Sequence, residues 1–421
     1  MPLLNEHYRK LPGQYLFPEI ERRVNERLAA DADLAPRLIR AGIGDVTEPL
    51  PPACVQALHD AAEEMARRES FRGYGPSSGH LFVREAIVAG EYAGLGIEAS
   101  ELFLSDGSKG DAGHALEVFA AGNRVGIADP VYPVYVDTNV LAGRTGGLAS
   151  NGLFDGLAPL AATESNGFVP DLPSQPLDLV YLCFPNNPTG AMIDRAGLER
   201  WVRWALDHDA VILYDGAYAD YVSDPDLPRT IYEIPDARRC AMEFRSLSKS
   251  AGFTGLRCGW TVCPRELEGR LPDGTRTAVH PMWSRRWATR SNGVSWPVQR
   301  AAAAAYSDSG REQVRSLIDL YRGNARILRE GSLAAGLRVW GGAHAPYVWI
   351  ACPEGLTSWG FFDRLLEEAA VVVTPGCGFG PGGEGYVRIS GFNSRENVEA
   401  IVERLGELLG TSAATAAERA C

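Results

Sequence analysis

A single lysine, Lys249, stands among serines and glycines in the segment FRSLSKSAGFTGLRCGW, residues 244–260, and Arg257 follows it by eight positions. Leu247 before it and the Ala-Gly-Phe turn after it would solvate an ammonium group poorly. An amine in such surroundings is unfavourable unless its charge is removed or used, and a neutral lysine amine forms Schiff bases with carbonyl compounds. The types and spacing of these residues therefore indicate amine chemistry at Lys249.

Polar side chains of complementary chemistry follow several apolar runs that are typical of buried parallel strands. The carboxyl ends of such strands meet at one edge of a sheet, where ligands bind. We therefore expect an amide, a carboxylate, a phenol and several hydroxyls to lie near Lys249. The runs and the residues that follow them are 178–185 with the motif NNPTG at 186–190, 210–214 with Asp215 and Tyr218, 101–107 with Ser108 and Lys109, and 240–245 with Ser246 and Ser248.

These groups match what pyridoxal phosphate needs from a protein. Lys249 would bind the aldehyde of the cofactor, and Asp215 would keep its ring nitrogen protonated so that the ring accepts electrons from a substrate α-carbon. Asn187 and Tyr218 can donate to the phenolate oxygen of the ring, and Tyr132, in DPVYPVY, is positioned to hold the ring flat. The phosphate needs helix-start amides, hydroxyls and a fixed cation. The candidates for the phosphate site are Ser108, Lys109, Ser246, Ser248 and Arg257.

Each of these features also has an ordinary structural explanation. The NNPTG motif alone is a turn, Asp215 alone could cap a helix, and Ser108 with Lys109 could simply begin one. Their joint occurrence favours the cofactor site, because Asp215 follows Asn187 by 28 positions and Lys249 follows Asp215 by 34. The same residues could support transamination, β-elimination, racemisation, decarboxylation or oxidation, since the cofactor ring supplies only the electron sink.

The elements that must position these residues predict an α/β fold. Between about residues 50 and 300, short apolar runs alternate with helical patterns such as 195–209, which is typical of a mostly parallel sheet flanked by helices. After residue 300 a long helix at 298–336 leads into strands at 338–342, 346–353, 371–376 and 385–392. We expect an N-terminal segment at 1–48 packed with the small domain, a large cofactor domain at 49–300, a small α/β domain at 301–410 and a disordered tail at 411–421.

Composition narrows the classes of partner. The chain has 421 residues, of which 45% are hydrophobic and 22% charged, and its net charge of −12 argues against nucleic acid or an anionic membrane as the main partner. The eight cysteines form no CxxC pair, and the seven histidines supply no neighbouring ligand set, so we expect no metal site. Without an apolar run of signal-peptide or membrane-span length, a cytoplasmic location is expected.

The chain resembles the LL-diaminopimelate aminotransferase family, within the class I and II aminotransferases of pyridoxal-phosphate fold type I. The resemblance runs from about residue 5 to 408. The sequence segments that carry the resemblance include YLFPEI, GIGDVTEPLP, GYGP, SDGSK, DPVYPVYVDTN, YLCFPNNPTGA, APYVW and FNSRENVE.

This resemblance implies a transaminase that exchanges an α-amino group between an amino acid and a 2-oxo acid, with 2-oxoglutarate and glutamate as one couple. It implies that Lys249 carries the proton as well as the cofactor, with Asp215 and Tyr218 as catalytic partners, and that Arg388, in GYVRIS, clamps the substrate carboxylate. It also implies a homodimer with shared active sites. Tyr74 would reach the partner's phosphate site and Asn292 the partner's substrate pocket. Residues implied to contact substrate within the chain are Tyr15, Gly44, Lys109 and Asn187.

The sequence departs from the family pattern after GYGP. The family has a glutamate there that recognises the far ammonium group of diaminopimelate, and this chain has Ser77. Losing a charge-assisted hydrogen bond weakens binding by about 1.5–3 kcal/mol. Gly110, Gly216 and Asp220 are smaller departures. An enzyme of specialised metabolism that acts on another basic or dicarboxylic amino acid is therefore the alternative.

Two other classes fit less well. A cofactor-binding regulator of this fold would carry a basic DNA-binding domain, for which the N-terminal segment is too short. A nicotinamide dehydrogenase would need a glycine fingerprint after its first strand, and the sequence has none.

Overall fold

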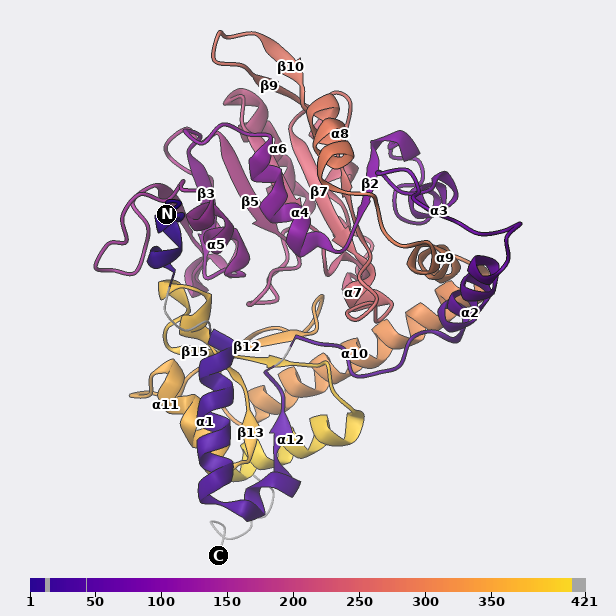
Figure 1. Ribbon diagram of the computed structural model, residues 1–421. Coiled ribbons are helices and arrows are strands. Elements are labelled where there is room, and N and C mark those ends of the chain that lie inside the picture. Colours follow the sequence, from indigo (N-terminus) through magenta and orange to yellow (C-terminus); the bar gives the residue numbers. More distant parts are fainter. Residues whose placement is uncertain (12–15, 43, 411–421) are drawn as a thin grey trace, which may run out of the picture.

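The computed structural model describes residues 1–11, 16–42 and 44–410, and within these residues seven strands form the large sheet. From β4 through β3, β5 and β6 to β7 the neighbours pair in parallel, and β8 runs antiparallel to both β7 and β2. The predicted α/β class with a mostly parallel sheet is confirmed (Figure 1). In sheet order the strands are β2 (Leu102–Ser105), β8 (Gly259–Val262), β7 (Ala241–Ser246), β6 (Val211–Asp215), β5 (Leu179–Cys183), β3 (Val125–Asp129) and β4 (Leu157–Ala161).

Both faces of this sheet are apolar because helices cover both. In β5, Val180 and Leu182 pack into one core with α6 (Arg195–Asp207), whereas Leu179 and Tyr181 pack into another with α8 (Val279–Arg290). This alternation along a strand with a period of two explains why the run is apolar throughout. The other helices around the sheet are α2 (Pro52–Ala66), α3 (Leu81–Glu91), α4 (Ser108–His114), α5 (Val134–Leu141), α7 (Leu247–Ser250) and α9 (Trp296–Ala305).

A second, smaller sheet lies beside the first. Four strands of the described chain form it in the antiparallel order β11-β12-β15-β14, with α10 (Asp308–Ala334), α11 (Ser358–Glu368) and α12 (Arg395–Leu408) packed around it. The helix α10 extends from this sheet towards α2 at the edge of the large one (Figure 1). The strands are β11 (Val339–Gly341), β12 (Tyr347–Ala351), β15 (Tyr386–Ser390) and β14 (Thr374–Pro375).

Residues 16–40 pack against the smaller sheet, whereas residues 5–10 contact the helix α5 beside the large sheet, where the Asn5 side-chain amide donates to the Leu141 carbonyl at 3.1 Å. Ile20 and Val24 of α1 (Leu16–Ala30) join the apolar core of the C-terminal part. The short strand β1 (Ile39–Arg40) pairs in parallel with β13 (Val371–Val372). The tail expected to be disordered, 411–421, lies outside the described residues.

Three local expectations were wrong or incomplete. The long helix predicted at 298–336 is two helices, since α9 ends at Ala305 and Ser307 caps α10 by accepting from the Gly310 N–H at 3.1 Å. The strand predicted at 371–376 divides into β13 and β14, which belong to different sheets. The strand β8 and the hairpin of β9 (Glu268–Arg270) and β10 (Arg276–Ala278) were not foreseen.

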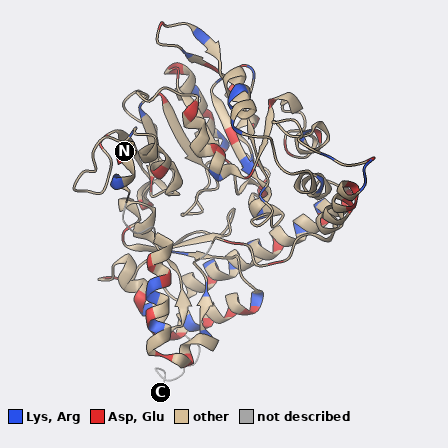
Figure 2. Cartoon of the chain, viewed as in Figure 1, with Lys and Arg blue, Asp and Glu red and all other residues tan. Residues whose placement is uncertain are grey.

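Charged residues are frequent on outer helices such as α1 (Figure 2). The strand β7 also carries two of them, Glu243 and Arg245. Both Glu243 and Arg245 of β7 are buried. Arg245 contacts Glu91 at 2.8 Å and Asp220 at 3.2 Å, and Glu243 accepts from the Tyr92 hydroxyl at 2.6 Å. The contact between Arg245 and Asp220 fixes the loop that follows β6. In the part of the chain that the structure describes, no helix is long and apolar enough to cross a membrane.

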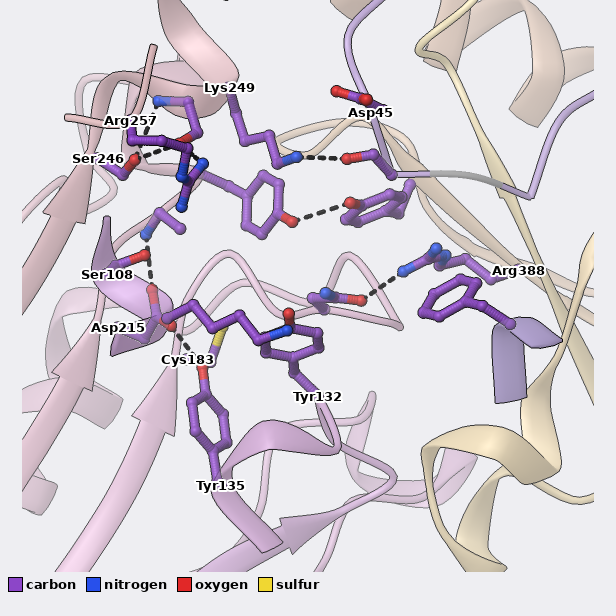
Figure 3. A pocket seen from close by; sticks show the side chains of 18 residues that line it. Asp45, Ser108, Tyr132, Tyr135, Cys183, Asp215, Ser246, Lys249, Arg257 and Arg388 are labelled. Atoms are coloured by element: carbon purple, nitrogen blue, oxygen red, sulfur yellow. Dashed lines mark hydrogen bonds between the residues drawn. The ribbon is translucent and has the colours of Figure 1, made fainter. Parts of the chain in front are cut away.

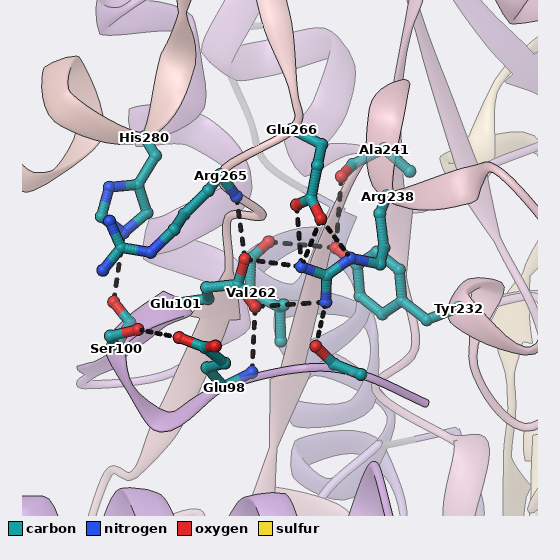
Figure 4. Close-up of polar contacts among 11 residues, drawn as sticks. Glu98, Ser100, Glu101, Tyr232, Arg238, Ala241, Val262, Arg265, Glu266 and His280 are labelled. Atoms are coloured by element: carbon teal, nitrogen blue, oxygen red, sulfur yellow. Dashed lines mark hydrogen bonds and ion pairs between the residues drawn. The ribbon is translucent and has the colours of Figure 1, made fainter. Parts of the chain in front are cut away.

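A buried carboxylate also anchors the start of β2. Glu101 is fully buried and contacts Arg238 at 3.0 Å, which in turn contacts Glu266 at 2.7 Å (Figure 4). The backbone N–H groups of Glu98 and Arg265 donate to the same carboxylate at 2.9 and 2.8 Å. The edge of the large sheet is thus held by a small ionic network.

Candidate active site

Most of the residues selected from the sequence meet at one cavity of about 360 Å³ between the two sheets (Figure 3). They come from segments that lie far apart in the chain, and the ends of the large-sheet strands bring them together. The predicted residues that line the cavity are Gly44, Ser108, Lys109, Tyr132, Asn187, Asp215, Tyr218, Ser246, Ser248, Lys249, Arg257 and Arg388.

Lys249 reaches the cavity from α7, a single helical turn that begins where β7 ends. The hydroxyl of Ser246 caps this turn by accepting from the Ser248 N–H at 3.0 Å, and the lysine amine donates to the carbonyl of Gly44. Loss of water around the amine lowers the pKa of Lys249 from 10.5 to about 8. Asp45 opposes this shift, and the charges of Arg388 and Arg257 add to it. A substantial fraction of Lys249 is therefore neutral near pH 8.

Asp215 ends β6 and lies at the bottom of the cavity, 5% exposed. One carboxylate oxygen accepts from the Tyr135 hydroxyl at 2.6 Å and the other from the Ala217 N–H at 2.9 Å. Burial raises the pKa of Asp215, while the hydrogen bonds from Tyr135 and Ala217 lower it. The two donors hold the carboxylate in one orientation, in which it can accept a further N–H from the cavity.

Arg388 is a buried cation, 2% exposed, that faces the cavity from β15. Its guanidinium donates to the Asn187 side-chain oxygen and to the Gly42 carbonyl, both at 2.7 Å. Its Nε has no hydrogen-bond partner, and no carboxylate pairs with it among the described residues. A buried cation of this kind is suited to binding an anion that enters from outside. Because Arg388 can only donate, Asn187 must accept through oxygen, so its amide N–H₂ remains as the donor.

A group of hydroxyls and cations forms the opposite end of the cavity. Arg257 contacts the Ser248 hydroxyl at 3.4 Å and the Thr254 carbonyl at 3.2 Å, and Ser246 contacts Ser248 at 2.7 Å. Ser108 begins α4 next to them. Arg257 has φ of +64°, a conformation that is unfavourable for a residue with a side chain and that is found at ligand sites.

Two glycines make room for this end of the cavity. A Cβ on Gly107, which has φ of +130°, would lie 2.5 Å from a guanidinium nitrogen of Arg257. A Cβ on Gly259 would lie 2.9 Å from the Ser108 backbone nitrogen. The close approach of these backbones brings Ser108 and Arg257 to the same place.

Four tyrosines border the middle of the cavity, namely Tyr132, Tyr135, Tyr218 and Tyr347. Tyr132 lies edge-on to Tyr135, with ring centroids 6.0 Å apart, and Tyr135 in turn stacks on Tyr181 at 4.9 Å. Tyr218 is buried, and its hydroxyl lies 2.8 Å from that of Tyr347. Burial raises the pKa of Tyr218 well above its usual value, so the group is a neutral phenol.

Some predicted residues are not in this cavity. Tyr74, Ser77 and Asn292 do not line it, and Tyr74 is 91% exposed. The loops that carry them lie side by side, since a Cβ on Gly293 would be 2.9 Å from the Pro76 carbonyl oxygen. Tyr15 lies outside the described residues.

Sequence reasoning missed six residues that line the cavity, and three of these contact or face its functional groups. Tyr135 holds Asp215, Tyr347 contacts Tyr218, and Asp45 faces Lys249. Tyr135 stands three positions after Tyr132 in the quoted motif DPVYPVY, and Tyr347 stands in APYVW. Nothing in the pattern separates such tyrosines from packing residues, because their role depends on where the hydroxyl ends.

The arrangement fits pyridoxal phosphate. The cavity combines a partly neutral amine, a buried carboxylate with an oriented lone pair, and a cradle that two glycine backbones leave open. Arg388, whose Nε has no hydrogen-bond partner, lines the cavity at the end away from Arg257 and the hydroxyls. In this arrangement Lys249 would hold the aldehyde, Asp215 the ring nitrogen, and the hydroxyls with Arg257 the phosphate.

Comparisons with known proteins agree with this arrangement. The model of the family described as aminotransferase class I and II matches residues 37–405. The L,L-diaminopimelate aminotransferase from Chlamydomonas reinhardtii is 43% identical, with 97% of this chain and 99% of that chain covered and a TM-score of 0.91. The substrate-bound structure of BacF from Bacillus subtilis is 27% identical, with 97% and 98% covered and a TM-score of 0.80. The Thermus thermophilus aspartate aminotransferase with maleate, 22% identical with 97% and 100% covered, shares the fold at a TM-score of 0.78.

Proposed function

The chain belongs to the class I and II aminotransferases and depends on pyridoxal phosphate, and from this premise we propose that it transfers the α-amino group of a long amino acid to 2-oxoglutarate. The donor in this proposal has a charged group at its far end, as diaminopimelate has. The relative from Chlamydomonas reinhardtii, named for L,L-diaminopimelate, supports this class of donor.

The observation that carries the proposal is the position of Arg388. Its buried guanidinium has no carboxylate partner in the described chain and opens onto the cavity that holds the amine of Lys249. A substrate carboxylate bound there would place the α-carbon of an amino acid near the lysine. Arginine is suited to this task because its planar fork binds both carboxylate oxygens.

The residues of the chain divide the work of the reaction. Arg388 and Asn187 hold the α-carboxylate end, and Asp215 holds a positive charge on the ring nitrogen. When bound, the cofactor supplies the electron sink that makes the α-proton of the substrate acidic. Lys249 would take that proton on its Nζ and would then deliver it to the C4′ carbon of the bound cofactor. A pKa of about 8 suits this role at neutral to slightly alkaline pH.

A homodimer with shared active sites is part of the proposal. Tyr74 and Asn292 are exposed on neighbouring loops outside the cavity of their own chain. The loop between α2 and α3 that carries Tyr74 projects from the body of the molecule (Figure 1). Such a loop is suited to entering the site of a second copy, with Tyr74 at its phosphate end.

Ser77 favours a second candidate for the donor. A serine cannot form the ion pair that an ammonium group at the far end of diaminopimelate would need. Asp45 is the carboxylate that lines the cavity besides Asp215 in the described chain. A different basic or dicarboxylic amino acid is therefore the alternative donor.

The experiment is a half-reaction panel. Purified holoenzyme is mixed with LL-diaminopimelate, lysine, ornithine, arginine, aspartate or glutamate, and the conversion of the bound cofactor to its amine form is followed by absorbance. We expect rapid conversion with glutamate and with one long donor, and reversal by 2-oxoglutarate. Failure of every α-amino acid to convert the cofactor would contradict the proposal.

A matched variant separates the two donors. If Ser77 weakens the hold on a far ammonium group, Ser77→Glu should raise kcat/KM for LL-diaminopimelate by about ten- to a hundredfold, in line with one charge-assisted hydrogen bond. Ser78→Glu, one position along, is the control for added charge. Fast turnover of LL-diaminopimelate by the unchanged enzyme would instead exclude the alternative donor.

A further inference from the structure

Tyr347 places a hydroxyl in the cavity that none of the roles above uses. The residue begins β12, is 1% exposed, and lines the cavity next to Tyr218. The two hydroxyl oxygens are 2.8 Å apart, and the two rings meet edge to face with centroids 5.1 Å apart. Gly44 leaves space for this hydroxyl, because a Cβ there would lie 2.4 Å from it.

The direction of the hydrogen bond between the two phenols follows from the charge above one of them. One hydroxyl must donate and the other accept. The guanidinium carbon of Arg388 lies 4.2 Å from the ring centroid of Tyr347, in cation–π geometry. A cation over the ring withdraws electron density and makes the O–H of Tyr347 the stronger donor. Burial raises the pKa of both phenols and that of Tyr218 the further, which agrees with Tyr218 as the acceptor.

We propose that Tyr347 is a positioning residue that donates to the Tyr218 oxygen and thereby turns the hydrogen of Tyr218 into the cavity. A phenol that accepts from one side must direct its own hydrogen elsewhere, and the open side of Tyr218 is the cavity. There the hydrogen would donate to the ring oxygen of a bound cofactor, and this bond would favour the deprotonated form of the lysine–cofactor link. The inference rests on the proposed function only in placing the cofactor in this cavity.

A purely structural role for Tyr347 would depend on its ring and not on its hydroxyl. Its ring packs with Tyr218, Tyr221, Tyr321 and Phe392 in one apolar cluster. Phenylalanine keeps that ring and removes only the hydroxyl. Tyr347→Phe therefore isolates the hydrogen bond from the packing.

The test is a pH titration of the visible absorbance of the holoenzyme without any amino acid. We expect Tyr347→Phe to raise the midpoint by about half a unit to one unit, as the loss of one neutral hydrogen bond would. The ionisable groups that face the pair stay in place, namely Lys249 from α7, Arg388 from β15, Cys183 from β5 and Asp45 after β1. Tyr321→Phe is the matched control, since its hydroxyl accepts from the Thr47 and Glu48 N–H groups outside the cavity.

A double variant decides whether Tyr347 acts through Tyr218. Tyr218→Phe alone should shift the midpoint at least as far as Tyr347→Phe, and the double variant should shift it no further. An unchanged midpoint in either single variant, or additive shifts in the double, would overturn the proposal. Because no substrate is present, these results are independent of the outcome of the half-reaction panel.

Discussion

At the scale of single residues, the chemistry of the site depends on how little water surrounds one amine. Desolvation lowers the pKa of Lys249 to about 8, and the nearby guanidinium groups of Arg388 and Arg257 reinforce the shift. The lysine needs no dedicated base to become a nucleophile at physiological pH.

This shift makes the uptake of cofactor dependent on pH. A lysine whose folded pKa is lowered is protonated below that value and neutral above it, and only the neutral amine combines with an aldehyde. The rate at which apoenzyme takes up pyridoxal phosphate should rise about tenfold per unit up to pH 8 and level off above it. Stopped-flow absorbance measures this rate.

Asp45 provides the control for this prediction. Its charge raises the pKa of Lys249, so Asp45→Asn should move the midpoint to lower pH. A midpoint near 10.5 in the unchanged protein would contradict the desolvation of Lys249.

The residues that the sequence could identify are those whose chemical type is rare at a strand end. An amine, a carboxylate and an amide after successive apolar runs were recognisable as Lys249, Asp215 and Asn187. Tyr135 and Tyr347 were not, because a tyrosine on an apolar element is ordinary packing until the partner of its hydroxyl is known. That partner is set by tertiary structure, across 80 residues in the case of Tyr135 and Asp215.

At the scale of elements, strand ends were easier to predict than strand pairings. The apolar runs at 178–185 and 210–214 gave the strands that deliver Asn187 and Asp215, because burial on both faces leaves a clear pattern. The antiparallel strand β8 was missed although it lies in the same sheet, since Gly259–Val262 is short and follows a glycine-rich turn. The break at Ser307 was missed because its hydrogen bond to the Gly310 N–H depends on geometry rather than composition.

The ionic network at the start of β2 gives a prediction about stability. Arg238→Met removes the cation that faces the buried carboxylate of Glu101, whose two backbone donors remain. An unpaired buried charge is unfavourable, so the free energy of unfolding should fall by about 2–4 kcal/mol. Urea denaturation followed by circular dichroism measures the change.

The neighbouring residue serves as the comparison. Arg239 pairs with Asp236 at the surface, where both side chains are largely exposed. Arg239→Met should change the free energy of unfolding by less than about 0.5 kcal/mol. Equal effects of the two substitutions would contradict the importance of burial at Glu101.

At the scale of the whole molecule, the proposed shared sites can be tested by complementation. Lys249→Ala should abolish activity, and Tyr74→Ala should reduce it strongly by weakening the hold on the partner's cofactor. Mixed dimers of the two variants have one complete site if Tyr74 acts across the interface. After subunit exchange, the mixture should recover about a quarter of the unchanged activity, because half of the dimers are mixed and each has one good site.

The outcome that would contradict shared sites is equally clear. If Tyr74 serves its own chain, exchange restores nothing. A fully active protein that elutes as a monomer in size-exclusion chromatography would also contradict shared active sites.

The most direct measurement of the central claim uses the scarcity of lysine in this chain, which has only Lys10, Lys109 and Lys249. Reduction of the holoenzyme with sodium borohydride fixes the lysine–cofactor link, and tryptic mapping by mass spectrometry locates it. The expected result is a single modified peptide, residues 246–257, in which trypsin no longer cleaves after Lys249. Modification at Lys109, which lines the same cavity, or at no lysine would contradict the account.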